Sequence, residues 1–260
     1  MTVPVALRPL SYFWTAFRRT WRSDLSDSFI TPLLFLSSLG VGLGSLVGHG
    51  HRLASLGGVD YLSFVAPALL AATAMQVALV RSTWEVFGYV SHWNGAYRSM
   101  QASPISVHQI VTGQLAWVAL RVELASAAYL GVSAAFGAVR SPEAAGVLLV
   151  GPLVGVAFAA PTAAYSVGVR HDQPLVLIFR LLMLPLFLFS GTFFPVSQLP
   201  QALRYLAYAL PLWHGVELSR GLYLGTLGAG AAALHLGYLV GLSGLGVLAA
   251  RATYTRKLAR

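Results

Sequence analysis

The 260-residue sequence contains no cysteine and few charged residues. Without cysteine, the chain cannot form a disulfide, a thiolate metal site or a cysteine nucleophile. Charged residues make up only 10% of the chain, whereas soluble domains carry about 25%. Hydrophobic residues account for 57%, and the mean hydropathy is +0.70. Because so few charges cannot cover a water-exposed surface, the composition excludes an ordinary soluble protein and predicts an integral membrane protein.

Acidic residues and lysine are scarce, so the positive charge of the chain comes almost entirely from arginine. The formal net charge is +9, and Lys257 is the single lysine. A basic balance often indicates nucleic-acid binding, but these charges are scattered between long apolar runs. Basic residues gather at the cytoplasmic ends of membrane spans. We therefore interpret the charge as a topology signal and expect no nucleic-acid partner.

The sequence also lacks the motifs of nucleotide hydrolysis and of metal binding. No P-loop lysine motif is present, and the glycines of residues 42–48 do not have the spacing of a dinucleotide-binding loop. His49 and His51 have no third ligand beside them, which makes them a poor metal site. We therefore expect no enzyme active site, no metal site and no cofactor bound by this chain.

Long apolar runs predict six membrane-spanning helices in one domain, residues 1–260. A span needs about 20 apolar residues, and a helix satisfies its own backbone polar groups in lipid. No repeat of solenoid length and no low-complexity linker divides the chain. The fold is therefore predicted to be all-α. The expected spans are residues 29–47, 59–80, 107–136, 144–169, 175–194 and 227–250.

The arginine distribution gives the orientation, because six spans place both chain ends on one side. The proposed cytoplasmic side holds Arg8, Arg18, Arg19, Arg22, Arg81, Arg98, Arg170, Arg180, Arg251, Arg256, Lys257 and Arg260. The outside holds only Arg52, Arg140, Arg204 and Arg220. This bias satisfies the positive-inside rule in one orientation. Since residues 1–27 also lack a cleavable signal, we expect a multi-pass protein of the cell inner membrane with both termini cytoplasmic.

Residues 1–27 are expected to form a cytoplasmic amphipathic helix that lies in the membrane interface. Aromatic residues recur near helical spacing, at Tyr12, Phe13, Phe17 and Trp21, and arginines fall between them. This composition suits the depth of lipid headgroups. The alternative is a soluble helix packed on protein.

Residues 81–106 form the most informative polar segment, with several aromatic residues among polar ones. Aromatic side chains in a loop need a surface to cover, and Ser103-Pro104 can start a helix because proline is tolerated in the first turn. The segment is therefore predicted to contain a short helix that docks on a cytoplasmic partner. The alternative is a solvated connector.

Residues 195–225 change abruptly from apolar sequence to short pieces broken by Pro195, Pro200 and Pro211. Such pieces are too short to span, and irregular backbone at membrane depth is tolerated only when it is buried in protein or lines a cavity. We expect short re-entrant helices before the last span, which form an extracytoplasmic gate. The alternative is a packed periplasmic loop.

Arg121 and Glu123 fall midway along the third predicted span. Ionisable residues there are costly and often functional. Their spacing of two places them on different helix faces, so they do not pair simply with each other. They either line a substrate path or form a structural ion pair at a subunit contact.

Three stretches resemble ABC-2 type exporter permeases, in the branch that includes drug, polysaccharide and nodulation-factor export permeases. Residues 189–200 (FSGTFFPVSQLP) and 210–220 (LPLWHGVELSR) are similar to that branch's signature. Residues 97–106 (YRSMQASPIS) resemble its coupling region. The order of elements also resembles the family over almost the whole chain.

This resemblance implies an exporter with two membrane subunits, identical or related, and two separate ABC ATPase subunits that hold ATP and Mg. The substrate would be drug-like, lipid-like or a glycan. The resemblance implies coupling to the ATPase through Tyr97, Arg98, Met100 and Pro104. It implies an outer gate at Phe193, Phe194, Pro195, Pro200, Pro211 and His214. Membrane lipids complete the expected partners.

Other classes of function remain open from the residues alone. An ion-coupled secondary transporter needs carboxylates near the bilayer midplane, and Glu123 is the clear candidate. A membrane enzyme needs clustered polar groups at one interface, and the sequence shows no such cluster. A non-transporting assembly subunit would show no substrate-dependent ATPase stimulation.

Overall fold

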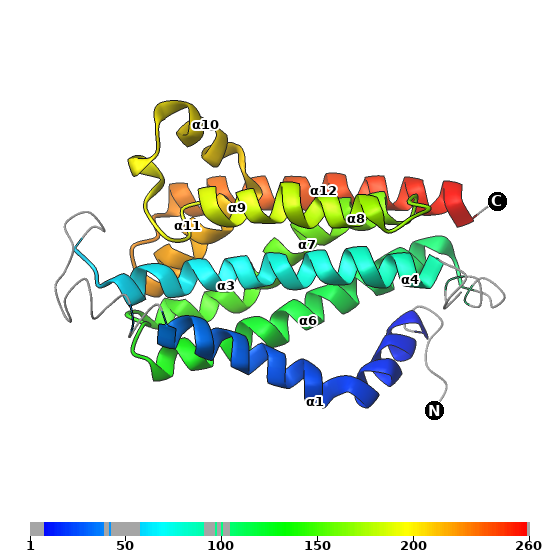
Figure 1. Cartoon of the computed structure of the whole chain (residues 1–260), viewed down its shortest axis with the longest axis horizontal. Coiled ribbons are helices and arrows are strands. Elements are labelled where there is room, and N and C mark those ends of the chain that lie inside the picture. Colours follow the sequence, from blue (N-terminus) through cyan, green and yellow to red (C-terminus); the bar gives the residue numbers. More distant parts are fainter. Residues whose placement is uncertain are drawn as a thin grey trace.

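The computed structural model describes residues 8–38, 42, 58–90, 97, 100 and 105–258. All regular elements in this part of the chain are helices, and the long ones run side by side along the longest axis of the molecule (Figure 1). The all-α prediction is therefore confirmed for the described residues.

Four helical segments in the described ranges are long and apolar enough to cross a membrane. They correspond to the second, third, fourth and sixth predicted spans. The first joins α3 (Tyr61–Val80), the π-helical η4 (Arg81–Glu85) and α4 (Val86–Val90). The others are α6 (Val107–Ala135), η5 (Pro142–Gly146) with α7 (Val147–Ser166), and α12 (Ala229–Leu258).

The first and fifth predicted spans are less regular. Helix α1 (Arg8–Leu36) is a single bent helix that contains residues 8–27 of the predicted interfacial segment and the start of the first span (Figure 1). The rest of that span lies largely outside the described residues. The fifth is a shorter apolar run of α8 (Gln173–Leu177), η6 (Ile178–Met183) and α9 (Leu184–Phe189). The six-span count and the interfacial helix stay predictions.

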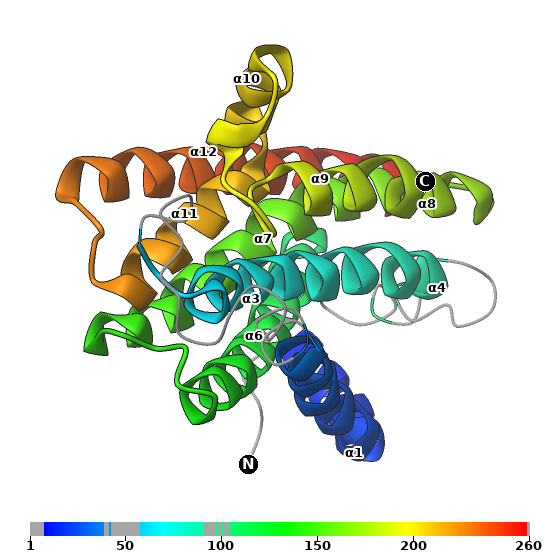
Figure 2. The same ribbon diagram turned by 60° about the vertical axis from the view of Figure 1, so that its left-hand side comes forward.

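Helix α7 is the centre of the bundle and packs against α3, α6, α11 and α12 (Figures 1 and 2). Two glycines allow the close approach of α6. A Cβ added at Gly151 would lie 2.2 Å from Ser126 Oγ, and one at Gly155 would lie 2.8 Å from Val122 Cγ2. Small residues four apart permit such contacts between membrane helices.

Side-chain caps fix where the long helices begin. Asp60 accepts a hydrogen bond from Ser63 N at 3.1 Å and so caps α3. Ser106 and Gln109 form a reciprocal capping box at the start of α6. These bonds satisfy backbone donors that have no partner within the helix.

The segment between the fifth predicted span and α12 consists of short helices: η7 (Val196–Gln198), α10 (Gln201–Ala209) and α11 (Pro211–Leu224). A proline directly precedes η7 and α10 and begins α11. Helix α10 projects from the side of the bundle in both views, near the end where α3 and α12 begin (Figures 1 and 2). The prediction of short helices before the last long helix agrees with this arrangement.

Large apolar side chains remain exposed on the outer helices of the bundle. They include Leu181 at 71%, Leu245 at 68% and Leu248 at 62%. An apolar surface of this kind needs lipid or protein to cover it. The described helices therefore have the surface of a membrane protein.

Candidate functional site

Two of the four predicted coupling residues, Tyr97 and Met100, lie in the described part of the chain, and both are buried. Tyr97 has no exposed surface, and its hydroxyl donates a hydrogen bond to Gln114 Oε1 at 2.9 Å. Its ring lies 5.4 Å from that of Tyr89 and 5.7 Å from that of Tyr254. Tyr97 therefore contacts α4, α6 and α12 together. Arg98 and Pro104 lie outside the described residues.

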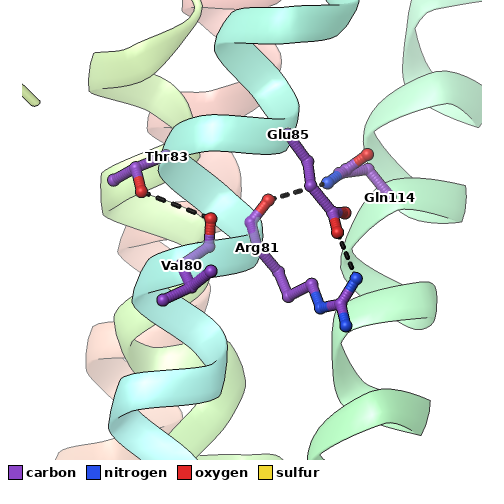
Figure 3. A network of polar contacts seen from close by, with 5 residues as sticks. All are labelled: Val80, Arg81, Thr83, Glu85 and Gln114. Carbon is purple, nitrogen blue, oxygen red and sulfur yellow. Dashed lines mark hydrogen bonds and ion pairs between the residues drawn. The ribbon is translucent and has the colours of Figure 1, made fainter. Parts of the chain in front are cut away.

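Gln114 connects Tyr97 to the π-helical segment η4. Its amide nitrogen donates to the backbone oxygen of Arg81 at 3.5 Å (Figure 3). Its amide oxygen accepts from Tyr97. On the same segment, Arg81 pairs with Glu85, and Thr83 Oγ1 donates to Val80 O at 3.3 Å (Figure 3). π-helical turns inside α-helices are frequent at functional sites. Sequence reasoning missed Gln114, because nothing local indicates which helix Tyr97 reaches.

Two further contacts hold η4 against its neighbours. Ser82 and Thr162 share a buried hydrogen bond of 2.7 Å between their side-chain oxygens, which joins η4 to α7. Trp84 stacks on Phe179 with ring centroids 6.4 Å apart. This second contact joins η4 to another π-helical segment, η6. The helix that leads into the coupling segment is thus fixed to the central helix and to the fifth predicted span.

The two intramembrane ionisable residues lie in different surroundings. Arg121 is 7% exposed, and its guanidinium carbon lies 4.5 Å from the ring centroid of Phe17. It therefore belongs to the contact between α1 and α6. Residues two apart on a helix are about 200° apart around its axis, so Glu123 faces away from Arg121. The Oε2 atom of Glu123 is buried with no hydrogen-bond partner among the described residues. Whether either residue contacts substrate stays a prediction.

The predicted gate residues lie at the end of the bundle where α3 and α12 begin. Phe193 packs edge-on against Phe187 with centroids 5.0 Å apart. Phe194 belongs to a small apolar cluster around the buried Val196, Leu199 and Ala207. Pro195, Pro200 and Pro211 flank the short helices of this segment. The segment therefore has a core of its own.

His214, the last predicted gate residue, is buried and joins α11 to α12. Its Nδ1 lies 2.9 Å from His235 Nδ1, and its Nε2 lies 3.1 Å from the backbone oxygen of Tyr208. Because a carbonyl oxygen only accepts, His214 Nε2 carries the hydrogen and Nδ1 accepts from His235. The ring of Tyr238 stacks on His214 with centroids 3.8 Å apart. Sequence reasoning missed His235 and Tyr238, which sit in the apolar first half of α12.

A second polar contact at the same end joins the α6–α7 connection to α3. Arg140 Nη2 donates to Asp60 Oδ1 at 2.5 Å, and Arg140 Nε donates to Ser63 Oγ at 3.1 Å. Partial burial alone raises the pKa of Asp60, but the hydrogen bonds from Arg140 and Ser63 outweigh it and hold the pKa below its usual value. Arg220 on α11 also bonds to α3 and to Gly191. Two arginines, Arg140 and Arg220, therefore connect neighbouring segments to α3 at this end of the bundle.

No group of three or more histidine, aspartate or glutamate side chains is close enough to hold a metal ion within the described ranges. The polar groups at both ends instead bond to backbone oxygens or to one another. This arrangement can join helices and hold them in register.

Comparison with known proteins gives a family match and several similar chains. The family described as ABC-2 type transporter matches residues 11–224. Nodulation protein J of Bradyrhizobium diazoefficiens is 30% identical over 262 aligned positions, covering 96% of this chain and 95% of that protein. Nodulation protein J of Sinorhizobium fredii is 30% identical over 226 positions, covering 87% and 83%. The protein of that name from Rhizobium leguminosarum bv. trifolii is 30% identical over 212 positions, covering 82% and 78%.

Proposed function

Because the chain belongs to the ABC-2 type transporter family, we propose that it is the permease subunit of an ATP-binding-cassette exporter. The family match identifies a membrane transport subunit rather than the ATPase. In the proposed complex, two such subunits work with two cytoplasmic ABC ATPases, which bind ATP and Mg. The observation that carries the proposal is the burial of Tyr97 among three helices, because it gives the coupling segment a direct mechanical connection to the bundle.

The proposed substrate is lipid-like, drug-like or a glycan, and it moves outward. The similarity to several proteins named Nodulation protein J agrees with the nodulation-factor export branch that the sequence resembles. The resemblance of residues 189–200 and 210–220 to exporters of drugs, polysaccharides and nodulation factors supports the same class.

In the proposed orientation, the bundle crosses the inner membrane of the cell. The end of the bundle that contains α4 faces the cytoplasm. Helix α4, the start of α1 and the end of α12 lie at the same end of the molecule (Figure 1). Arg251, Arg256 and Lys257 belong to the last turns of α12. Basic residues favour the cytoplasmic side, so both termini are placed there.

ATP binding must favour one arrangement of the membrane subunits for export to occur. A ligand shifts an equilibrium only through different affinities for its states. We propose that the ATPases contact residues 97–106 differently in each state. Tyr97 then displaces Gln114 and the backbone of η4, and this movement reaches α7 through the Ser82–Thr162 hydrogen bond.

Replacement of Tyr97 tests this connection. In membranes that contain both subunit types, Tyr97→Ala is expected to lower export per ATP hydrolysed by about fivefold or more, the lower end of typical allosteric coupling. ATP hydrolysis itself is expected to continue. Tyr165→Ala is the matched control, because Tyr165 on α7 is 51% exposed and lies outside both the coupling residues and the gate segment. Unchanged export per ATP in a folded Tyr97→Ala variant would contradict the proposed connection.

Glu123 gives one observation that favours ion-coupled transport as the second candidate. Its buried, unpartnered Oε2 resembles the intramembrane carboxylates of proton relays. Transport that follows a proton gradient without ATP would favour this candidate. ATP-dependent transport in the absence of any gradient would favour the exporter.

A further inference from the structure

Arg220 on α11 connects three separate parts of the outer end. Its Nη2 donates to the backbone oxygen of Gly191 at 2.7 Å, and its Nε donates to the backbone oxygen of Phe64 at 3.3 Å. The guanidinium carbon lies 3.8 Å from the ring centroid of Phe64. Arg220 therefore joins α11 to the turn after α9 and to the first residues of α3.

The turn at Gly191 is shaped to present its carbonyl oxygen to Arg220. Gly191 has φ +76°, and a Cβ at this position would lie 2.9 Å from Val196 Cγ2. The flanking Ser190 and Thr192 are fully buried, and their hydroxyls have no hydrogen-bond partner among the described residues. The turn is therefore joined to α11 by the hydrogen bond from the Arg220 guanidinium to the backbone oxygen of Gly191.

The counter-charge of Arg220 lies on its own helix. Glu217 accepts from Arg220 Nη1 at 2.6 Å, three residues earlier on α11. Removing a partner from a buried charge is strongly destabilising. Because Glu217 moves with Arg220, α11 can separate from Gly191 and Phe64 while the ion pair stays intact. Of the contacts that Arg220 makes, only the bonds to two neutral carbonyls and the contact with one aromatic ring must break.

We propose that Arg220 is the latch of the outer gate, a positioning residue that holds α11 against α3 and the Gly191 turn in the closed state. The proposal rests on the proposed function in one respect, that residues 195–225 form the gate. Opening moves α11 with its Glu217–Arg220 pair away from both carbonyls and exposes the buried Ser190–Thr192 backbone. The latch is reversible because no buried charge is left without its counter-charge.

Because the chain has no native cysteine, a single introduced cysteine is the only thiol that a maleimide can label. This makes the latch directly testable. Thr192→Cys places that thiol at a fully buried position of the turn. In purified full-length protein, a polar maleimide is expected to label it slowly. Adding Arg220→Lys or Arg220→Gln is expected to raise the labelling rate about tenfold, because hydrogen bonds to charged donors are among the stronger ones.

Two controls separate gate opening from general loosening. Arg204→Gln also removes an arginine that bonds backbone oxygens of this segment, those of Ser197 at 2.5 Å and Leu199 at 3.2 Å, but these bonds do not cross to α3. It is expected to leave labelling at position 192 unchanged. Ser166→Cys, fully buried at the end of α7, reports global unfolding and is expected to stay slow in every variant.

Each outcome decides the proposal. Faster labelling at position 192 in the Arg220 variants, with slow labelling at position 166, supports the latch. Labelling at position 192 that stays slow in both folded Arg220 variants overturns it. If both variants unfold, Phe64→Leu, which removes the ring under the guanidinium but keeps the carbonyl, must raise labelling for the latch to stand. The labelling experiment needs no ATPase, so it tests the latch separately from ATP-driven export. Faster labelling in the Arg220 variants of a protein that shows no ATP-driven export would support the latch and contradict the proposed function.

Discussion

Single polar side chains in this protein act mainly by joining helices that are distant in sequence. Tyr97 and Gln114 join the coupling segment to α6, and His214 and His235 join α11 to α12. In each pair the sequence indicated one member, because that member lies in a recognisable segment. The partners Gln114 and His235 could not be predicted, since hydropathy and local spacing do not show which helix faces pack together. The sequence indicated Glu123 as an unusual group, and its surroundings depend on the same packing.

At this scale, the histidine pair predicts an asymmetric response to substitution. His235→Leu leaves His214 Nδ1 buried without a donor, and the loss of one partner typically costs about 1–3 kcal/mol. The melting temperature of the detergent-purified protein should fall accordingly. Replacing both histidines with leucine should restore part of the loss, because no buried polar group is then left unpaired. His171→Leu, at an exposed position, is the matched control. A single variant as stable as the parent would show that the hydrogen bond contributes nothing.

Individual helices were predicted well where apolar runs are long and poorly where charge interrupts them. The expected second span ends at residue 80, but the helix continues through η4 and α4 to Val90. Arg81 and Glu85 pair four residues apart on this extension and so need no break in the helix. A hydropathy pattern places the end of a span at the first charged residue. The backbone hydrogen bonds of a helix do not depend on side-chain charge, so the helix can continue past that residue. The close approach of α6 and α7 was likewise not predicted from Gly151 and Gly155, because glycine is common throughout the sequence.

This close approach gives a prediction for the helix pair. Gly155→Leu places a side chain where Val122 already packs, and overpacking of a tight core costs about 1–3 kcal/mol. The matched control is Gly237→Leu on α12, because no atom lies within 4 Å of a Cβ at Gly237. Thermal unfolding in the same detergent should therefore separate the two variants. Equal melting temperatures would mean that α6 and α7 are not in contact at this position.

For the whole molecule, composition and arginine distribution were enough to predict a helical membrane protein, and three sequence stretches indicated the family. The central position of α7 and the burial of Tyr97 and Met100 needed the structure. Both depend on contacts between helices that are far apart in sequence. The bundle has buried polar connections at each end, one around Tyr97 and one around Arg220. This arrangement matches a protein that receives motion at one end and opens at the other.

The central claim is that a separate ATPase powers movement through these helices. The most direct measurement uses sealed inside-out vesicles from cells that produce this chain with an ABC ATPase partner. Uptake of a fluorescent acylated oligosaccharide into these vesicles is followed with and without ATP. The account predicts ATP-dependent uptake that disappears when either subunit is omitted or when the ATPase is catalytically inactive. Uptake by vesicles that contain this chain alone, driven by a proton gradient without ATP, would contradict it.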